Sequence, residues 1–262
     1  MANSIMDPTD DFVRFPLTGR FLAGRLRHDM SEAEKQKLES LVTETRTLID
    51  GELLVRRGDP CVNTTMLIDG FMLRTLENSE RRHAVSFHVP GDFVDLHSFP
   101  LGRLDHNIEC VGAARVGFVP HALIQEIVNE HPHLARLFWF STLLDAAMHR
   151  EWIMTLGQLP VPKRIAHVFA EIWARLDMVG RAFVDGFQTP LRQIDIADMC
   201  GATPVHVNRA LMQLRKDGIA DFRRGEVRVA NRAVLESFAE FDPTYLYGSH
   251  AEAPVTLRQA TR

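Results

Sequence analysis

The last third of the chain constrains the fold most strongly, because it places two helix starts and a glycine turn at a fixed spacing. Thr189-Pro190 and Thr203-Pro204 each put a capping threonine before a proline at the first helical position. Gly201 ends the first of these helices, with Ala197 four residues before it and Val207 six residues after it. This spacing predicts a helix-turn-helix, because the small Ala197 lets the helices cross closely and Val207 packs between them.

A hairpin is predicted directly after the second helix, which ends at Gly218. Its strands are Ile219–Phe222 and Glu226–Val229, with Arg223-Arg224-Gly225 as a basic tip between them. A hairpin in this position makes the predicted motif a winged helix-turn-helix. The alternative is a pair of helices that pack for stability alone and leave their arginines in solvent.

Basic residues of this segment lie at the helix starts, on the second helix and on the wing, where DNA phosphates would lie. We expect Arg209 to read guanine from the major groove and Val205 to contact a thymine methyl group, while His206 and Asn208 reach phosphates or adenine. Pairing of Arg209 with Asp198 is the alternative. The predicted DNA-binding residues are Arg192, Thr203, Pro204, Val205, His206, Asn208, Arg209, Arg215, Arg223 and Arg224.

Short β-prone runs separated by glycine turns occupy the first half of the chain. These runs are Glu52–Val55, Thr64–Asp69, Phe71–Leu76, His83–Val89 and Arg115–Val119. Many short strands with glycine punctuation predict a closed antiparallel barrel or a jelly roll. A short helix precedes them, because Ser31 and Glu34 have the spacing of a capping box.

An unbroken helical stretch of about 25 residues follows Pro132 and ends near Leu156. Apolar residues recur along it at alternating intervals of three and four, which is typical of a coiled-coil seam. The helix therefore forms a dimer interface or packs against its own barrel, and its length favours the dimer. The predicted dimerisation residues are Leu137, Phe140, Leu144, Ala147 and Met154.

The composition is that of a soluble globular protein, with 45% hydrophobic and 24% charged residues among 262. No apolar run reaches the length of a membrane span and the N-terminus lacks a signal-peptide pattern, so we expect a cytoplasmic protein. The net charge of −4 provides no global attraction for nucleic acid. Cys61, Cys110 and Cys200 lie far apart, which predicts neither a disulfide framework nor a zinc site.

Together these patterns predict an α+β fold with an N-terminal β-barrel, a long dimerisation helix and a C-terminal winged helix-turn-helix. The expected order begins with an irregular extension and a barrel, continues through the long helix and a hinge to the helix-turn-helix domain, and ends in a disordered tail. The corresponding ranges are 1–30, 31–131, 132–158, 159–243 and 244–262.

This order of parts resembles that of the cyclic-AMP receptor and fumarate-nitrate regulator (Crp/Fnr) family of bacterial transcription factors. In the barrel the resemblance lies in Gly51-Glu52, Gly58–Pro60, Met66–Gly70 and Pro90–Phe93, and in the helix-turn-helix it covers Ile196–Leu211. The resemblance implies a sensor barrel of the cyclic-nucleotide-binding type and a homodimer on a palindromic double-stranded DNA operator. It also implies contact with RNA polymerase, and a regulator of transcription that is no enzyme.

The chain departs from the family at its ligand-binding residues. Cyclic-nucleotide binders have Gly-Glu after the Pro-Gly-Asp turn and a later Arg-Ser/Thr-Ala, whereas this chain has Asp95-Leu96 and Leu104–Asn107. Cyclic AMP and cyclic GMP are disfavoured, because Asp105 would repel their phosphate. The oxygen-sensing branch binds an iron–sulfur cluster through N-terminal cysteines, and residues 1–60 contain none, which excludes that cofactor.

Histidine is frequent, with 12 in the chain, and several lie in or near the barrel. The predicted ligand pocket consists of Asp95, His97, Asp105 and His106. These side chains would suit a metal ion, a haem or a pH-sensitive anion site. Their spacing is not diagnostic, so we assign no metal and expect the pocket to hold an unidentified small molecule or nothing.

Two other functions compete with a signal-responsive regulator. A cupin-like metalloenzyme would need two histidines and a carboxylate on one strand pair; Asp95, His97 and His106 are the nearest match, but an enzyme leaves the winged helix-turn-helix unexplained. A ligand-independent DNA binder with a vestigial barrel would bind its operator equally with and without any metabolite, metal or gas.

Overall fold

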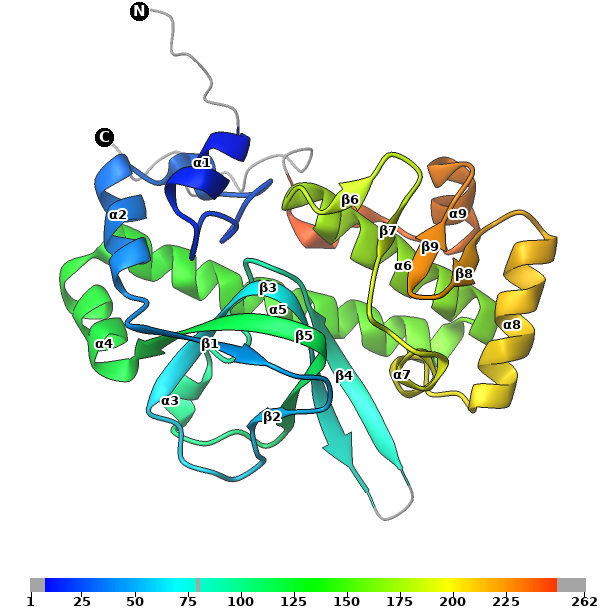
Figure 1. Cartoon of the computed structure of the whole chain (residues 1–262), viewed down its shortest axis with the longest axis horizontal. Coiled ribbons are helices and arrows are strands. Elements are labelled where there is room, and N and C mark those ends of the chain that lie inside the picture. The colour runs from blue at the N-terminus through cyan, green and yellow to red at the C-terminus, as the bar shows by residue number, and fades with distance from the viewer. Residues whose placement is uncertain (1–7, 79–80, 249–262) are drawn as a thin grey trace, which may run out of the picture.

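The chain folds into a β-sheet domain and a helical domain that lie along one long helix (Figure 1). The computed structural model describes residues 8–78 and 81–248. The fold is the expected α+β combination of a jelly roll with a helix-turn-helix domain. The strands of the jelly roll are β1 (Glu44–Leu48), β2 (Leu53–Val55), β3 (Asn63–Glu77), β4 (Arg82–His88) and β5 (Asn107–Pro120).

Helices surround this sheet and form most of the second domain. The jelly-roll domain includes α1 (Pro8–Arg14), the 3-10 turn η1 (Arg27–Asp29), α2 (Glu32–Ser40), α3 (Ser98–Leu101) and α4 (His121–Glu130), and is followed by the long helix α5 (Pro132–Gln158). The second domain consists of α6 (Val161–Met178), β6 (Ala182–Phe183), β7 (Gly186–Gln188), α7 (Gln193–Met199), α8 (Pro204–Lys216), β8 (Asp221–Arg223), β9 (Glu226–Arg228), α9 (Arg232–Phe238) and the turn η2 (Pro243–Leu246). Among the described residues, no helix has both the length and the apolar character that a membrane crossing needs.

The strand order of the jelly-roll sheet is β1-β5-β3-β4, with β2 also paired to β5, and every pairing is antiparallel. The sequence predicted two strands separated by a turn at Asp69-Gly70, where the structure has the single strand β3. Register shifts on both sides of Asp69 show that this dipeptide forms a bulge that bends the strand. The sequence also missed β1 and the first half of β5, because β1 has no hydrophobic alternation and Gly112 interrupts β5.

Glycine is required at the bulge for two reasons. The φ angle of Gly70 is +88°, in the left-handed region, and a Cβ atom there would lie 2.3 Å from the carbonyl oxygen of Ala113 in β5. Strands β3 and β5 therefore approach each other more closely at this point than a side chain would permit.

The N-terminal segment was predicted to be irregular, but from α1 onward it is packed onto the barrel. Phe21 is buried with its ring 5.3 Å from that of Phe93, in an edge-to-face contact. The guanidinium of Arg27 donates to Asp11 at 2.8 Å, and both side chains are largely buried. These aromatic and charged anchors have no period, so a pattern search does not detect them.

The tail beyond residue 243 was predicted to be disordered, but its first residues are ordered. Turn η2 ends at Leu246, which is fully buried, and the hydroxyl of Tyr245 donates to Glu171 at 2.8 Å. The rest of the predicted tail, residues 249–262, lies outside the described residues. Burial of Leu246 and the hydrogen bond of the half-buried Tyr245 hold this segment in place without any helical or strand period.

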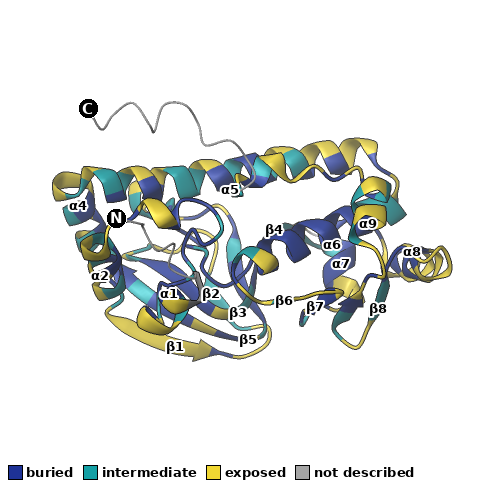
Figure 2. Ribbon diagram, turned by 90° about the horizontal axis from the view of Figure 1, so that it is seen from above, coloured by how far each residue is buried: buried dark blue, intermediate teal, exposed yellow. Residues whose placement is uncertain are grey.

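Helix α5 has the predicted length, 27 residues or about 40 Å, and runs along the molecule with both domains on one side of it (Figure 2). Three of the five predicted dimerisation residues are buried within the chain itself, whereas Phe140 is half-buried and Met154 is 37% exposed. Leu137, Leu144 and Ala147 are at most 6% exposed, because they pack inside their own chain against the barrel and the second domain. A heptad period alone does not say which of two neighbouring stripes faces inward.

A second stripe with the same period is exposed on α5, and each of its apolar residues comes one position earlier in the sequence than a residue of the predicted stripe. Trp139, Leu143 and Ile153 expose 66%, 54% and 71% of their surface, and Ala146 and Arg150 continue the intervals between them. Large apolar side chains in solvent at this spacing are typical of a surface that another helix covers. We call these five residues the outer stripe of α5.

We predict that Gly70→Ala destabilises the chain more than Gly51→Ala does. Both glycines have positive φ, so each alanine costs about 1–2 kcal/mol of backbone strain. A Cβ atom at Gly51 meets nothing within 4 Å, whereas at Gly70 it displaces β5 and costs about 1–3 kcal/mol more. Urea denaturation of both variants measures the difference, and equal losses would contradict the role assigned to the bulge.

Candidate nucleic-acid interface and ligand cavity

Helices α7 and α8 form the predicted helix-turn-helix. Gly201 joins them with a φ angle of +59°, and Ala197 and Val207 are buried where the helices cross. Thr203 caps α8 as predicted, since its hydroxyl accepts a hydrogen bond from the backbone nitrogen of His206. The interior of the motif therefore follows from the three residues that the spacing singled out.

Helix α7 begins later than predicted, and Thr189 is not its cap. The cap is Arg192, whose backbone nitrogen donates to the Asp195 carboxylate at 2.9 Å. Thr189 is buried ahead of the helix, where its backbone nitrogen donates to the carbonyl oxygen of Gly225 in the wing. Thr189 and Pro190 therefore connect β7 to α7, and the hydrogen bond from Thr189 fixes the wing beside α7.

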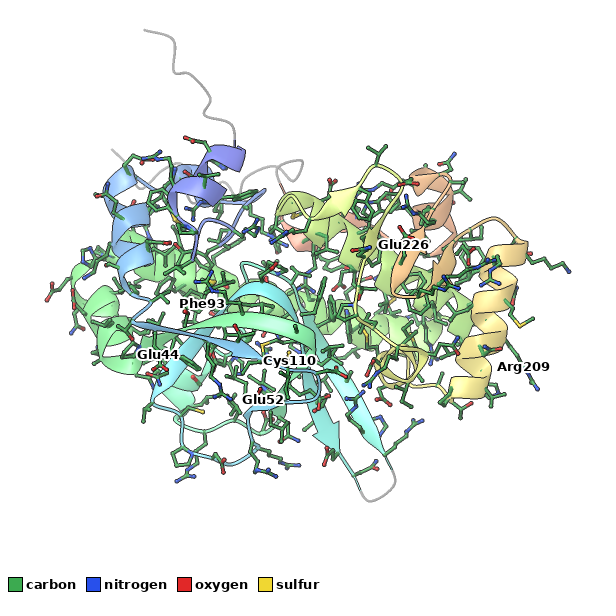
Figure 3. The ribbon with its side chains drawn as sticks, viewed as in Figure 1. Glu44, Glu52, Phe93, Cys110, Arg209 and Glu226 are labelled. Atoms are coloured by element: carbon green, nitrogen blue, oxygen red, sulfur yellow. The ribbon has the colours of Figure 1, made fainter. Side chains whose placement is uncertain are left out.

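The outer face of α8 is open to solvent. Arg209 extends from it away from the rest of the chain (Figure 3), and within the described residues it has no hydrogen bond or ion pair. Its alternative partner, Asp198, is bound by Arg82 instead, at 2.8 Å. Predicted DNA-binding residues that are exposed on this helix or its cap are Thr203, Pro204, Val205, His206, Asn208, Arg209 and Arg215.

Three other predicted DNA-binding arginines already have acidic partners. Arg215 and Arg223 are exposed but both pair with Asp221, at 2.7 and 3.0 Å. Arg192 pairs with Asp195 at 3.1 Å, at the junction with the barrel. A phosphate would have to compete with these carboxylates, whereas Arg209 has no internal contact to lose.

The tip of the wing faces the barrel. Arg224, with a φ angle of +52°, lines a cleft of 620 Å³ whose opposite wall includes Asp69 and Phe71 of β3. Arg181 and Asp69 both line the cleft and form an ion pair at 2.7 Å. Arg224 is exposed, and its contact with DNA stays a prediction.

A network of charges joins the barrel to the helix-turn-helix. Arg82 of β4 donates to Asp195 at 2.5 Å and to Asp198 at 2.8 Å, both on α7, and it also pairs with Glu109 of β5. Asp195 is fully buried. Burial alone would raise the pKa of Asp195, but hydrogen bonds from Arg192 and Arg82 hold it below its usual value. The sequence did not indicate this contact, because its residues lie more than 100 positions apart.

A cavity of 300 Å³ lies between the barrel and α5, and three of the four predicted pocket residues line it. The predicted residues are His97, Asp105 and His106. Polar side chains that the sequence analysis did not include are Arg74 of β3 and Asp145 and His149 of α5. The i, i+4 spacing of Asp145 and His149 was the available signal, but only the fold shows that these side chains face the barrel.

The two barrel histidines of this cavity are held in the neutral form. Burial and then the charge of Arg74 lower the pKa of His97 to about 3. Burial also lowers the pKa of His106 below its ordinary value, against the opposing effect of the hydrogen bond to Asp105. Neutral rings offer a nitrogen lone pair to a ligand.

Asp95, the fourth predicted pocket residue, does not line this cavity. Its carboxylate is buried and accepts hydrogen bonds from the backbone nitrogen of Thr65 at 2.5 Å and from the hydroxyl of Thr64 at 2.9 Å. Burial raises the pKa of Asp95 to about 6. The carboxylate therefore fastens the loop before α3 to β3.

Comparison with known proteins agrees with this architecture. Residues 163–238 match the Crp-like helix-turn-helix domain. A probable transcriptional activator of Rhizobium leguminosarum is 30% identical over 100 residues, which are 38% of this chain and 41% of that protein. The transcriptional activator protein anr of Pseudomonas aeruginosa is 19% identical over 79% of this chain and 84% of its own.

Solved structures show the same fold over most of the chain. The structure of FixK2 from Bradyrhizobium japonicum has a TM-score of 0.68 at 23% identity and covers 74% of this chain and 96% of its own. The regulator CLP of Xanthomonas campestris, described as responsive to c-di-GMP, has a TM-score of 0.61 at 15% identity and covers 75% of this chain and 99% of its own.

A jelly roll, a long helix and a helix-turn-helix with an open outer face define a DNA-binding transcription regulator. Residues 163–238 belong to the Crp-like helix-turn-helix family, and most of the chain is similar to regulators of the Crp/Fnr type. The chain spans 41% of the length of the Rhizobium leguminosarum activator.

We predict that Asp195→Asn lowers the free energy of unfolding by about 3–5 kcal/mol, because it removes the buried anion that Arg82 and Arg192 face. Asp69→Asn is the matched control, since the Asp69–Arg181 pair is exposed and contributes at most about 1 kcal/mol. Urea denaturation gives both values. Similar small losses in the two variants would show that the network does not join the domains.

Proposed function

We propose that this chain acts as a homodimer that inserts α8 of each subunit into the major groove of a palindromic operator. The observation that supports this most directly is Arg209 on the open face of α8, which has no ion pair or hydrogen bond within residues 8–78 and 81–248. Two-fold symmetric helix-turn-helix dimers place their recognition helices about 34–36 Å apart, in successive major grooves. As a DNA-binding regulator it would work in the cytoplasm, and contact with RNA polymerase follows from the family.

The dimer would form through the outer stripe of α5. A 27-residue helix is long enough for nearly four heptads, and the stripe presents Trp139, Leu143 and Ile153 at the required intervals. Arg150 is the one charged residue of the stripe, and a single polar residue in such a seam fixes register at some cost in stability. This register replaces the one predicted from Leu137 and Leu144.

The barrel would act as the sensor, and we take its effector to be other than cyclic AMP. Asp105 is exposed at the mouth of the 300 Å³ cavity, where a cyclic phosphate would meet a carboxylate. The one guanidinium of the cavity, that of Arg74, is already bound to Asp145 and to the carbonyl oxygen of Val94. A bidentate phosphate contact would have to break both interactions.

We predict that Leu143→Glu converts the dimer into a monomer. The substitution places two unpaired charges at the centre of the seam, which costs several kcal/mol, or at least about a hundredfold in the dissociation constant. Val128→Glu on α4 is the control, because Val128 is also exposed and apolar but lies off the stripe. Sedimentation velocity at micromolar concentration compares the two, and a dimeric Leu143→Glu protein would refute the stripe.

We predict that Arg209→Ala relaxes the base preference at one position of each half-site and loses about 1–3 kcal/mol there. Arg223→Ala should instead weaken binding to all sequences alike and reduce the salt dependence by about 0.9 per phosphate contact. Selection from randomised DNA, with salt titrations on the selected site, measures both effects. Since Arg209 has no partner among the described residues, the thermal stability of the Arg209→Ala protein should not change. An unchanged base preference in this stable variant would therefore contradict base reading by Arg209.

A further inference from the structure

We propose that the cavity between the barrel and α5 binds a divalent transition-metal ion through the ring nitrogens of His97, His106 and His149. The role of that ion as effector rests on the regulator function proposed above. The site itself does not, because metal binding is measured without DNA.

His106 is oriented as a metal-binding histidine would be. Its Nδ1 lies 2.7 Å from the carboxylate of Asp105, so the ring hydrogen must be on Nδ1 and the lone pair on Nε2. His106 is 8% exposed, and its Nε2 is buried without a hydrogen-bond partner among the described residues. Metal-binding imidazoles almost always donate the other ring N–H to a carboxylate or a carbonyl, as this ring does.

His149 has the same arrangement on the opposite wall. Its Nδ1 lies 2.9 Å from the backbone carbonyl oxygen of Asp145, which can only accept, so the lone pair of the neutral ring is on Nε2. The ring of His97 lies 5.4 Å from that of His106, between centroids. Three imidazoles from the barrel and α5 therefore line one cavity, and two of them have their tautomer fixed by a neighbour.

The remaining polar atoms of the cavity also favour a cation. Asp145 has one carboxylate oxygen that pairs with Arg74. Its second oxygen, Oδ1, is buried with no hydrogen-bond partner in the described part of the chain and lies 3.9 Å from Nδ1 of His149. With Asp105 at the mouth, two carboxylates face one guanidinium, so the cavity has an excess of negative charge and of lone pairs. A buried acceptor without a donor is costly, and a cation satisfies both orphaned atoms.

Imidazole nitrogen selects the kind of cation. Neutral imidazole suits zinc, copper, nickel and iron, whereas magnesium and calcium prefer an all-oxygen shell. The three rings must move toward the ion as it binds, because their nitrogens do not all lie within 4.8 Å of one another. Among the described residues, the group that already meets this distance is Glu126, Glu130 and His131, at α4. That surface group receives no assignment here, since Glu126 already pairs with Lys37.

An ion at this place would connect the sensor to the dimer helix. His97 and His106 belong to the barrel, whereas Asp145 and His149 lie on α5, directly beside Ala146 and Arg150 of the outer stripe. Drawing the rings together would pull α5 toward the barrel and change how the stripe meets its partner.

The test uses the full chain, freed of metal by a chelator, and titrates it with Co²⁺ and Zn²⁺ in a calorimeter. We expect one ion per chain. His149→Gln removes a ligand at a half-exposed position, and Asp105→Asn removes the carboxylate that orients His106. Each substitution should lower the affinity for the ion by about 10–100-fold. His131→Ala, which destroys the surface group on α4, is the matched control and should bind as the unaltered protein does.

The proposal would be overturned if neither ion binds at 100-fold molar excess. It would also be overturned if His131→Ala loses metal binding while the cavity variants keep it. A third contrary result would be a cavity that the diammonium ion putrescine saturates and that does not respond to metal. Should the cavity variants fail to fold, the unaltered protein with Co²⁺ still decides. In the proton NMR spectrum of the Co²⁺-loaded protein, ring N–H resonances shifted by the paramagnetic ion support imidazole ligation. The absence of such shifted resonances refutes imidazole ligation. Each readout is independent of DNA, so a failed operator assay leaves the metal result unaffected.

Discussion

The guanidinium of Arg82 determines where the helix-turn-helix lies on the barrel. It bridges β4 and β5 to two carboxylates of α7, one of them fully buried, and Arg192 completes the capping of the same helix. Removing these charges from water is favourable only while all partners are present, because a lone buried carboxylate would be strongly destabilising. The position of α7 on the barrel, and with it that of α8, which packs on α7, follows from this docking.

Local signals predicted the parts of the fold that local chemistry decides. The cap at Thr203, the turn at Gly201 and the length of α5 depend on neighbours within a few residues, and the structure confirms them. The start of α7, the bulge at Gly70 and the choice of the α5 stripe that is buried depend on distant partners. A heptad period or a threonine-proline pair is compatible with two arrangements, and long-range packing selects one.

The residues of the ligand cavity, too, could be predicted only in part from local sequence signals. Departures from the family pattern singled out Asp105 and His106, and the clustering of histidines added His97; all three line the cavity. Arg74, Asp145 and His149 were missed, since only the fold brings α5 against the barrel. Asp95 was included wrongly, because a sequence cannot show that Thr64 and Thr65 already satisfy its carboxylate.

Helix α5 has no unused face. One side is packed into the core through residues such as Leu144, another presents Asp145 and His149 to the cavity, and a third exposes the outer stripe. Each residue turns the helix by about 100°, so inserting or deleting one within α5 would rotate every later side chain onto the wrong surface. Loops of this protein can gain or lose residues over evolution, whereas the length of α5 should stay fixed between the cavity and the hinge.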